Sequence, residues 1–340
     1  MRLVFMGTPA FAAKCLEALL ETEHSVVAVY TKPDTPKDRG MKMLPSQVKT
    51  LALAHDLPVY QPDSFREEEV CQTLQNLAPD LIVAVAYGKI LPQRVLDIPP
   101  LGCINIHGSI LPKLRGSAPV QWAVLQDLPQ TGVTAMYMNA AMDEGDIIAV
   151  RTTPIGETET SSALMERLAV LGADLLRETI ADIAAGRAKR SPQDHAQASY
   201  APMLTKALSP IDWNRPARAI LAQIRGLDPW PVATAGLEGT VFKIWEAKAA
   251  AVEGRAAPGT PLALTKQGLV IACADGAILI TRLQAPGGKA MPAADYFRGH
   301  PIHIEPEISQ KPVQSGTSLS RTGDEGIAER SGASGTATKG

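Results

Sequence analysis

An asparagine and a histidine stand two positions apart where a short apolar run ends, in the segment Cys-Ile-Asn-Ile-His-Gly-Ser at residues 103–109. Such a run is typical of a buried strand. In an extended chain Asn105 and His107 project to the same face, so their side chains can flank one reacting atom. The amide can donate a hydrogen bond to a developing negative charge, and the imidazole can transfer a proton. Gly108 lets the backbone turn at once, so a ligand can approach closely.

A carboxylate partner for the histidine is predicted at Asp146, which opens the apolar run Asp-Ile-Ile after the turn residues Asp143 and Glu144. A carboxylate at the start of a strand can reach a histidine on a neighbouring strand, fix its ring and favour its charged form. Taken alone, each feature has an ordinary structural explanation. The first is compatible with a strand-terminating asparagine and a hydrogen-bonded, partly buried histidine, and the second with a solvated turn.

The elements that must position these residues form an alternating pattern of strands and helices over the first 150 residues. Apolar runs predict buried parallel strands, and helical spacing predicts helices at residues 11–20 and 46–54 between them. This alternation indicates an α/β, Rossmann-like domain with a parallel sheet covered on both faces. In such sheets ligands bind at the carboxyl ends of the strands, where Asn105 and His107 lie. The predicted strands are residues 3–6, 26–30, 81–86 and 103–106.

A second, smaller domain follows the first. Leucines at helical spacing from 164 to 175 predict a long helix that closes a first domain of residues 1–188, and a polar, proline-interrupted stretch at 189–206 is typical of a linker. Residues 207–308 begin with a helix that we expect Asn214 to cap. Short strands follow, with a hairpin signal at Asp275-Gly276, and predict a β-barrel, OB-like fold. The tail at 309–340 is rich in Ser, Gly and Thr and is predicted to be disordered.

The amino-acid composition argues against several classes of protein, among them membrane-spanning and disulfide-rich ones. Hydrophobic residues make up 45% and charged residues 20% of the chain, and no apolar run is long enough to cross a bilayer. Four scattered cysteines predict neither a disulfide framework nor a thiolate metal site, so we expect a cytoplasmic protein without bound metal. The net charge of -2 gives no overall attraction to nucleic acid, so a polyanionic partner would need a local basic patch.

Two segments together, INIHGSILPKLRGSAPVQWA and DEGDII, resemble the signature of the folate-dependent formyltransferases. The resemblance implies that Asn105, His107 and Asp146 form the catalytic centre and that 10-formyltetrahydrofolate is the formyl donor. The family's Ser-Leu-Leu-Pro donor-binding motif corresponds here to Ser109, Ile110, Leu111 and Pro112, with isoleucine in place of the first leucine. By the same resemblance, the strand end that bears Val85 and Tyr87 lines the folate pocket.

A basic loop predicts the acceptor. Residues 32–49 carry five basic and two acidic side chains, a net charge of +3, in a loop punctuated by Gly and Pro. Charge alone fits a solvated loop as well as a phosphate-binding one. The segments TKPDTPKDRGMKMLPSQVKTLA, IDWN and DPWP resemble the branch of the family that formylates initiator methionyl-tRNA, which implies that Lys37, Arg39 and Lys42 contact tRNA and that the second domain assists. We expect a monomer.

Three other functions are compatible with parts of the sequence. A formyltransferase acting on a sugar nucleotide or another small amine would share the HGSILP motif, but we expect it to lack the long basic loop. A Rossmann dehydrogenase is disfavoured, because Gly7-Thr8-Pro9 does not continue as G-x-G-x-x-G. A non-catalytic tRNA-binding module would keep the basic loop but has no need of Asn105 and His107 together. A formyl-transfer assay separates the non-catalytic module, and a labelled-formyl assay that offers aminoacyl-tRNAs and small amines side by side separates the acceptors.

Overall fold

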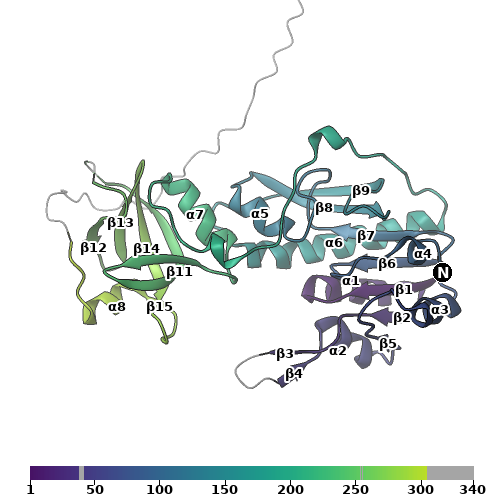
Figure 1. Ribbon diagram of the computed structural model, residues 1–340. Coiled ribbons are helices and arrows are strands. Elements are labelled where there is room, and N and C mark those ends of the chain that lie inside the picture. Colours follow the sequence, from purple (N-terminus) through teal and green to yellow (C-terminus); the bar gives the residue numbers. More distant parts are fainter. Residues whose placement is uncertain (38–41, 253, 255, 305–340) are drawn as a thin grey trace, which may run out of the picture.

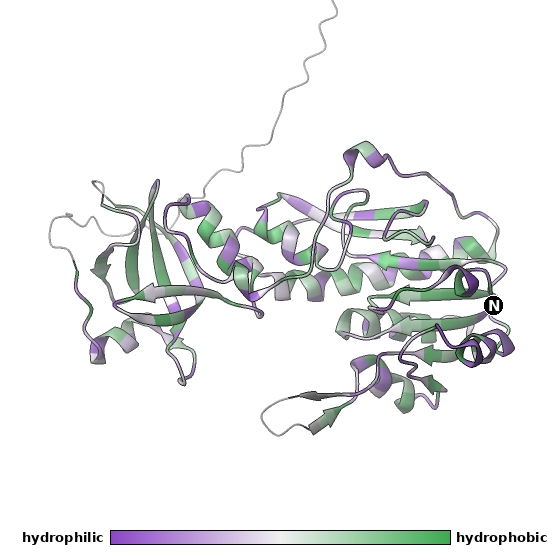
Figure 2. Cartoon of the chain, viewed as in Figure 1, coloured by the Kyte–Doolittle hydropathy of each residue, from purple (hydrophilic) through white to green (hydrophobic). Residues whose placement is uncertain are grey.

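The chain folds around two large β-sheets (Figure 1). The first sheet lies between two hydrophobic cores, and the second packs on separate cores of its own. The computed structural model describes residues 1–37, 42–252, 254 and 256–304, so the tail predicted at 309–340 lies outside the described residues. Figure 2 shows that the strands of both sheets are predominantly hydrophobic, whereas polar residues gather in the connections. None of the described helices has the length and apolar character of a membrane span.

The first sheet has seven strands in the order β5-β2-β1-β6-β7-β8-β9. The five strands from β5 to β7 run parallel, and β8 and β9 are antiparallel to their neighbours. This mostly parallel sheet confirms the predicted α/β class. The strands are β1 (Arg2–Gly7), β2 (Ser25–Tyr30), β5 (Val59–Tyr60), β6 (Leu81–Val85), β7 (Cys103–His107), β8 (Gln130–Tyr137) and β9 (Ile147–Pro154).

Helices cover both faces of this sheet because each strand alternates its side chains between two cores. Leu3 and Phe5 of β1 pack in the core beneath α1 and α6, whereas Val4 and Met6 pack in the core beneath α3 and α4. The Thr160 hydroxyl caps α6 by accepting a hydrogen bond from the Ala163 amide. The helices are α1 (Ala10–Leu20), α2 (Gln47–Ala54), α3 (Glu68–Asn76), α4 (Gln93–Leu96), α5 (Pro119–Leu125) and α6 (Ser161–Ala184).

The second sheet is antiparallel, with the order β10-β11-β14-β13-β12 and β15 paired to β14. It curls around a core of its own (Figure 1), and β13 and β14 form the hairpin predicted at Asp275-Gly276. The strand order begins at β10 and ends at β12, and among the described residues β15 pairs with β14 alone. The elements are α7 (Ala217–Gly226), β10 (Ala233–Leu237), β11 (Thr240–Ala250), β12 (Pro261–Leu264), β13 (Leu269–Cys273), β14 (Gly276–Gln284), β15 (Met291–Pro292) and α8 (Ala293–Gly299).

The predicted cap of the second-domain helix is corrected by the structure. Pro216 precedes the first turn of α7, and the Ala217 amide donates a hydrogen bond of 2.7 Å to a carboxylate oxygen of Asp275. Asn214 instead donates to Asp212. The free amide at the start of α7 is therefore satisfied by a residue from the β13–β14 turn, far along the chain.

The two units pack through α5 and α7. Asp127, which follows α5, pairs with Arg218 and with Arg225 of α7, the second at 3.0 Å. The connection between the units contains two short turns of 3-10 helix, His195–Gln197 and Lys206–Leu208. It runs back over the first domain, because Ser191 forms a β-bridge with Ile147 and Tyr200 forms one with Arg115.

A small hairpin leaves the body of the first domain after β2. Its strands β3 (Thr35–Lys37) and β4 (Lys42–Leu44) pair antiparallel and project from the sheet (Figure 1). The base of the hairpin is fixed by Lys49, whose ammonium donates to Asp34 at 2.6 Å and to Gln61 at 2.7 Å. Gln61 in turn donates to the other Asp34 oxygen and to the Lys32 carbonyl. The basic loop predicted from the sequence is thus a hairpin with an anchored base.

Candidate active site

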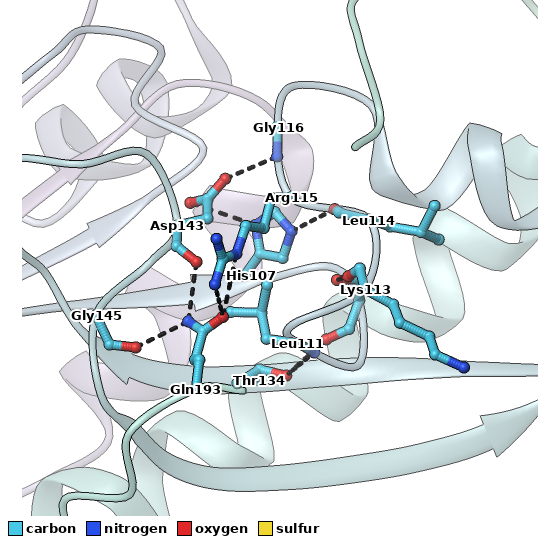
Figure 3. Close-up of polar contacts among 11 residues, drawn as sticks. His107, Leu111, Lys113, Leu114, Arg115, Gly116, Thr134, Asp143, Gly145 and Gln193 are labelled. Atoms are coloured by element: carbon cyan, nitrogen blue, oxygen red, sulfur yellow. Dashed lines mark hydrogen bonds and ion pairs between the residues drawn. The ribbon is translucent and has the colours of Figure 1, made fainter. Parts of the chain in front are cut away.

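Asn105 and His107 occupy the end of β7, at the carboxyl edge of the parallel sheet. The His107 ring is 6% exposed, and its Nε2 lies 2.9 Å from the Leu114 carbonyl (Figure 3). A carbonyl oxygen can only accept, so Nε2 carries the hydrogen of this bond. Asn105 is half-buried, and among the described residues its amide has no hydrogen-bond partner. It is therefore available to a ligand beside a fixed imidazole.

The carboxylate beside His107 belongs to Asp143, not to the predicted Asp146. An oxygen of Asp143 lies 3.7 Å from His107 Nδ1, and the other accepts a hydrogen bond of 2.8 Å from the Gly116 amide (Figure 3). Asp146 instead faces Arg190, at 3.9 Å, and its side chain is 38% exposed. The pairing predicted between Asp146 and His107 is therefore wrong in this structure, although the turn that supplies the carboxylate is the predicted one.

The backbone path of this turn explains why Asp143, and not Asp146, lies beside His107. The Asp146 carbonyl accepts a hydrogen bond from the Tyr137 amide, so the backbone of Asp146 already belongs to the β8–β9 pairing. A Cβ atom at Gly145 would lie 1.8 Å from the Tyr137 oxygen, so only glycine lets the chain pass there. Asp143 has a φ of 56°, a left-handed conformation that aspartate tolerates better than most residues. This backbone path therefore places the Asp143 carboxylate beside His107, at the end of β7.

The predicted donor-binding residues 109–112 shape a loop directly after β7. Ser109 donates from its hydroxyl to the Lys113 carbonyl at 2.6 Å. The Thr134 hydroxyl donates to the Ser109 carbonyl at 2.6 Å and accepts from the Leu111 amide at 3.1 Å. Leu111 is buried, whereas Ile110 and Pro112 are half-buried. These polar groups of residues 109–112 thus have hydrogen-bond partners within the protein. Thr134 of β8, which sequence reasoning missed, binds both the Ser109 carbonyl and the Leu111 amide.

We expect Thr134→Val to lower the free energy of unfolding by roughly 1 to 3 kcal/mol, because it leaves the buried Leu111 amide and Ser109 carbonyl without their partner. Thr134 has no exposed surface, so water cannot replace the lost bonds. Urea denaturation measures the change. The control is Thr134→Ser, which keeps the hydroxyl and should lie nearer to the wild type than the valine variant. A valine variant as stable as the wild type would show that Thr134 does not support the loop.

The two other residues predicted to line the folate pocket lie in different cores. Val85 is fully buried in the core beneath α1 and α6, on the opposite face of the sheet from His107, so its side chain does not reach the catalytic face. Tyr87 lies in the core beneath α3 and α4, edge-on to Phe65 with ring centroids 6.3 Å apart. Its hydroxyl is buried and has no partner among the described residues. Burial raises the pKa of Tyr87 far above its ordinary value, so the hydroxyl keeps its proton and can donate.

Two of the three predicted tRNA-contacting residues, Lys37 and Lys42, lie in the strands of the hairpin. Arg39 lies outside the described residues. Lys37 ends β3 and Lys42 begins β4, and the two are paired across the hairpin by their backbones. Nowhere in the described part of the chain do three or more His, Cys, Asp or Glu side chains lie together so that they could hold a metal ion.

Comparisons with known proteins match both units. The family model described as formyl transferase matches residues 1–180, and the model of the formyl transferase C-terminal domain matches residues 203–301. A methionyl-tRNA formyltransferase of Pseudomonas entomophila is 49% identical over 297 residues, which is 87% of this chain and 95% of that protein. The methionyl-tRNA formyltransferase of Trichlorobacter lovleyi is 45% identical over 303 residues, covering 89% and 95%.

Solved structures share the fold at low sequence identity. HypX from Aquifex aeolicus, in complex with tetrahydrofolic acid, has a TM-score of 0.62 and 20% identity over 92% of this chain and 50% of its own. An N-formyltransferase from Helicobacter canadensis, in complex with folinic acid and dTDP-3-aminofucose, has a TM-score of 0.60 and 19% identity over 82% and 98%. At this level of identity the likeness concerns the fold.

Proposed function

This chain belongs to the formyl transferase family, and from that premise we propose how its residues carry a formyl group from 10-formyltetrahydrofolate to the free amino group of initiator methionyl-tRNA. It is a formyl-transferring enzyme, and its product is the N-formylmethionyl-tRNA that starts translation. The observation that carries the assignment of residues is one constellation at the end of β7: the available Asn105 amide, the His107 imidazole and the Asp143 carboxylate.

Asn105 and His107 stabilise the charge that develops during transfer. When the amine attacks the formyl carbon, negative charge gathers on the formyl oxygen, and preorganised hydrogen-bond donors at that place lower the barrier. The amide of Asn105 has no competing partner among the described residues, so it can donate without first breaking a bond. The His107 ring is held by Leu114 and cannot turn away. Because Nε2 is already bound to Leu114, the His107 donor to the formyl oxygen is the N–H at Nδ1 of the charged ring, on the same face of β7 as the Asn105 amide.

Asp143 and His107 carry out the proton transfers of the reaction. The attacking nitrogen loses a proton as its bond to the formyl carbon forms, and the folate nitrogen gains one as its bond to that carbon breaks. A histidine beside a carboxylate suits both transfers, because the carboxylate stabilises the charged ring. Asp143 faces Nδ1 of His107 while Gly116 holds the other carboxylate oxygen. We therefore assign to Asp143 the role that the resemblance implied for Asp146.

The donor fits the catalytic face beneath α3 and α4. Tyr87 offers a protonated, buried hydroxyl that lacks a partner among the described residues, and such an orphaned donor suits a ligand with hydrogen-bonding ring atoms. Apolar side chains of the same core, among them Leu91 and Val95, suit a flat ring. We assign this region, with the loop formed by residues 109–112, to the folate. The donor supplies the formyl group and these residues orient it.

The β3–β4 hairpin and the second domain are assigned to the acceptor. The hairpin joins the first domain through an anchored base, so a bound acceptor arm would be held in a defined position relative to β7. We divide the chain into a catalytic domain (1–188) and an auxiliary RNA-binding domain (207–308), joined by residues 189–206. We also propose a monomer in the cytoplasm. The four cysteines, all free and buried, are consistent with a reducing compartment.

Arg39→Ala is expected to weaken binding of methionyl-tRNA by roughly 1 to 3 kcal/mol, because a charge-assisted contact to phosphate is lost. The same change should flatten the salt dependence of acceptor binding, since fewer counterions are released. Donor binding should stay unchanged, because the folate is assigned to Tyr87 and the loop of residues 109–112 and not to the hairpin. Dissociation constants for both ligands across a salt series measure this. Arg177→Ala on the exposed part of α6 is the control; equal losses for both ligands would mean that Arg39 supports the active site instead.

The function is tested by incubating the protein with 10-formyltetrahydrofolate and methionyl-tRNA and measuring N-formylmethionyl-tRNA and tetrahydrofolate. Equal amounts of both products are expected. An aminosugar nucleotide is the alternative acceptor, and it is less well supported, because relatives that match 87% or more of this chain are methionyl-tRNA formyltransferases. Absence of formylated tRNA with both substrates present would contradict the assignment.

A further inference from the structure

The segment that joins the two domains lies against both loops of the active site. Near its start, Ser191 forms a β-bridge with Ile147, at the start of β9. Further along, the Ser199 hydroxyl accepts a hydrogen bond of 2.9 Å from the Leu114 amide, and the Ser199 carbonyl accepts one of 2.8 Å from the Arg115 amide. Leu114 is the residue whose carbonyl receives the His107 hydrogen bond. The segment from 191 to 201 is therefore a strap over the catalytic loops rather than a free linker.

Gln193 is the one buried glutamine of this strap, with 6% of its surface exposed. Its amide nitrogen donates to the Asp143 carbonyl at 2.9 Å and to the Gly145 carbonyl at 2.8 Å (Figure 3). Both hydrogens of the amide are thus used on the turn that carries the Asp143 carboxylate. No other described side chain donates a hydrogen bond to either of these carbonyls. These two hydrogen bonds therefore fix the Gln193 side chain and the backbone of the Asp143 turn relative to each other.

Arg115 connects this contact to the loop that follows β7. Its guanidinium is 1% exposed and donates to the Gln193 oxygen from Nε at 3.2 Å and from Nη2 at 2.8 Å. Nη1 pairs with Glu144, in the same turn, at 3.0 Å. The next residue, Gly116, donates to the Asp143 carboxylate itself. A closed set of hydrogen bonds therefore runs from the β7 loop through Arg115 and Gln193 to the Asp143 turn.

We propose that Gln193 is a positioning residue for formyl transfer: through the Asp143 and Gly145 carbonyls it holds the Asp143 carboxylate against His107. The inference rests on the proposed function of Asp143 and adds a residue from outside the catalytic domain's sheet. The left-handed backbone of Asp143 makes such support necessary, because a non-glycine residue keeps a φ of 56° only where its surroundings hold it. Arg115 orients the Gln193 amide, since its two N–H groups can bind only the oxygen end.

Two substitutions separate the hydrogen bonds of the Gln193 amide from the volume of the Gln193 side chain. Gln193→Met keeps the length and loses all four hydrogen bonds. Gln193→Glu keeps an acceptor for Arg115 but loses both donors and places a carboxylate against two carbonyl oxygens. We expect both variants to lower kcat on the order of tenfold, with the KM values of donor and acceptor little changed, and the glutamate variant to lose more. The pH dependence of kcat should also change, since Asp143 no longer faces His107 in a fixed geometry.

The matched control is Gln197→Met in the same strap, where the side chain of the exposed glutamine donates, within the described part of the chain, to Asp194 alone. It should retain the wild-type kcat. Thermal unfolding of each variant and titration of active enzyme show whether a loss comes from unfolded protein. A reduced active fraction with an unchanged kcat per active site and an unchanged pH profile would overturn the positioning role and leave Gln193 purely structural.

Asp143→Asn in the same series separates the two claims. A large loss in Asp143→Asn together with wild-type kcat in Gln193→Met and Gln193→Glu overturns the role of Gln193 alone. Wild-type kcat in Asp143→Asn overturns the proton-transfer role of Asp143 and, with it, the reason for positioning this turn. Losses in all three variants, with the Gln197 control unaffected, are the result we expect.

Discussion

Replacing His107 by alanine should reduce kcat for formyl transfer on the order of a hundredfold or more, because the variant lacks both a donor to the developing negative charge and a route for the proton. Asn105→Ala should lose a comparable factor, since its amide is the second donor on the same face of β7. Interactions made mainly in the transition state lower kcat more than they raise KM. The KM for each substrate should therefore change much less than kcat.

Steady-state kinetics with both substrates varied measures these effects. His55→Ala is the control, because His55 is an exposed histidine at the end of α2, remote in sequence from the catalytic loops. Loss of the His107 bond to Leu114 could also loosen the following loop, so thermal unfolding and circular dichroism are recorded for every variant. A folded His107→Ala protein with near-normal kcat would remove His107 from the catalytic centre.

Asp143→Asn should lower kcat by a factor similar to that of His107→Ala, whereas Asp146→Asn should remain within about twofold of the wild type. The amide introduced at position 143 is nearly the same size as the carboxylate, but it lacks the charge that stabilises a charged imidazole. Asp146 has its ion-pair contact with Arg190, on the exposed side of the turn. Surface ion pairs of this kind contribute about 1 kcal/mol or less.

The comparison of these two aspartates discriminates between positions three residues apart in one turn. It requires kcat as a function of pH for both variants and the wild type. The wild-type profile should be preserved in Asp146→Asn and altered in Asp143→Asn. The reverse pattern, with Asp146→Asn inactive and Asp143→Asn normal, would restore the partner predicted from the sequence and contradict the arrangement at the end of β7.

The architecture of the first domain could be predicted because its strands and helices differ in period and are separated by clear breaks. The runs at residues 3–6, 26–30 and 103–106 all fall within strands of the seven-stranded sheet. The position of Asn105 and His107 at the carboxyl end of a strand followed from the same pattern, since side chains two residues apart in a strand share a face. These predictions depend on local sequence, and the structure confirms them.

The identity of the carboxylate could not be predicted from the same kind of evidence. Asp143, Glu144 and Asp146 all lie in one turn, and which of them reaches His107 depends on the register between β8 and β9. That register is set by contacts such as the Tyr137 amide on the Asp146 carbonyl, which no local pattern reveals. The face of the sheet on which Val85 lies could not be predicted for a related reason. A strand buried on both sides is uniformly apolar, so its sequence does not show which core a residue enters.

The strap between the domains was missed because its contacts are made by single polar residues. Residues 189–206 have the composition of a linker, and only the fold shows that Gln193 is buried among carbonyl groups and an arginine. The cap of α7 by Asp275 is similar, because the donor and acceptor are 58 residues apart. Long-range polar contacts of this kind depend on the tertiary structure, which hydrophobic periodicity does not encode.

The central claim is that this enzyme formylates methionyl-tRNA, and it is tested most directly by comparing two acceptors in one assay. The ratio kcat/KM is measured with 10-formyltetrahydrofolate as donor for methionyl-tRNA and for a nucleotide-linked aminosugar, with deacylated tRNA as the blank. We expect methionyl-tRNA to be preferred by several orders of magnitude and deacylated tRNA to accept no formyl group. A kcat/KM for the aminosugar equal to or greater than that for methionyl-tRNA would contradict the account.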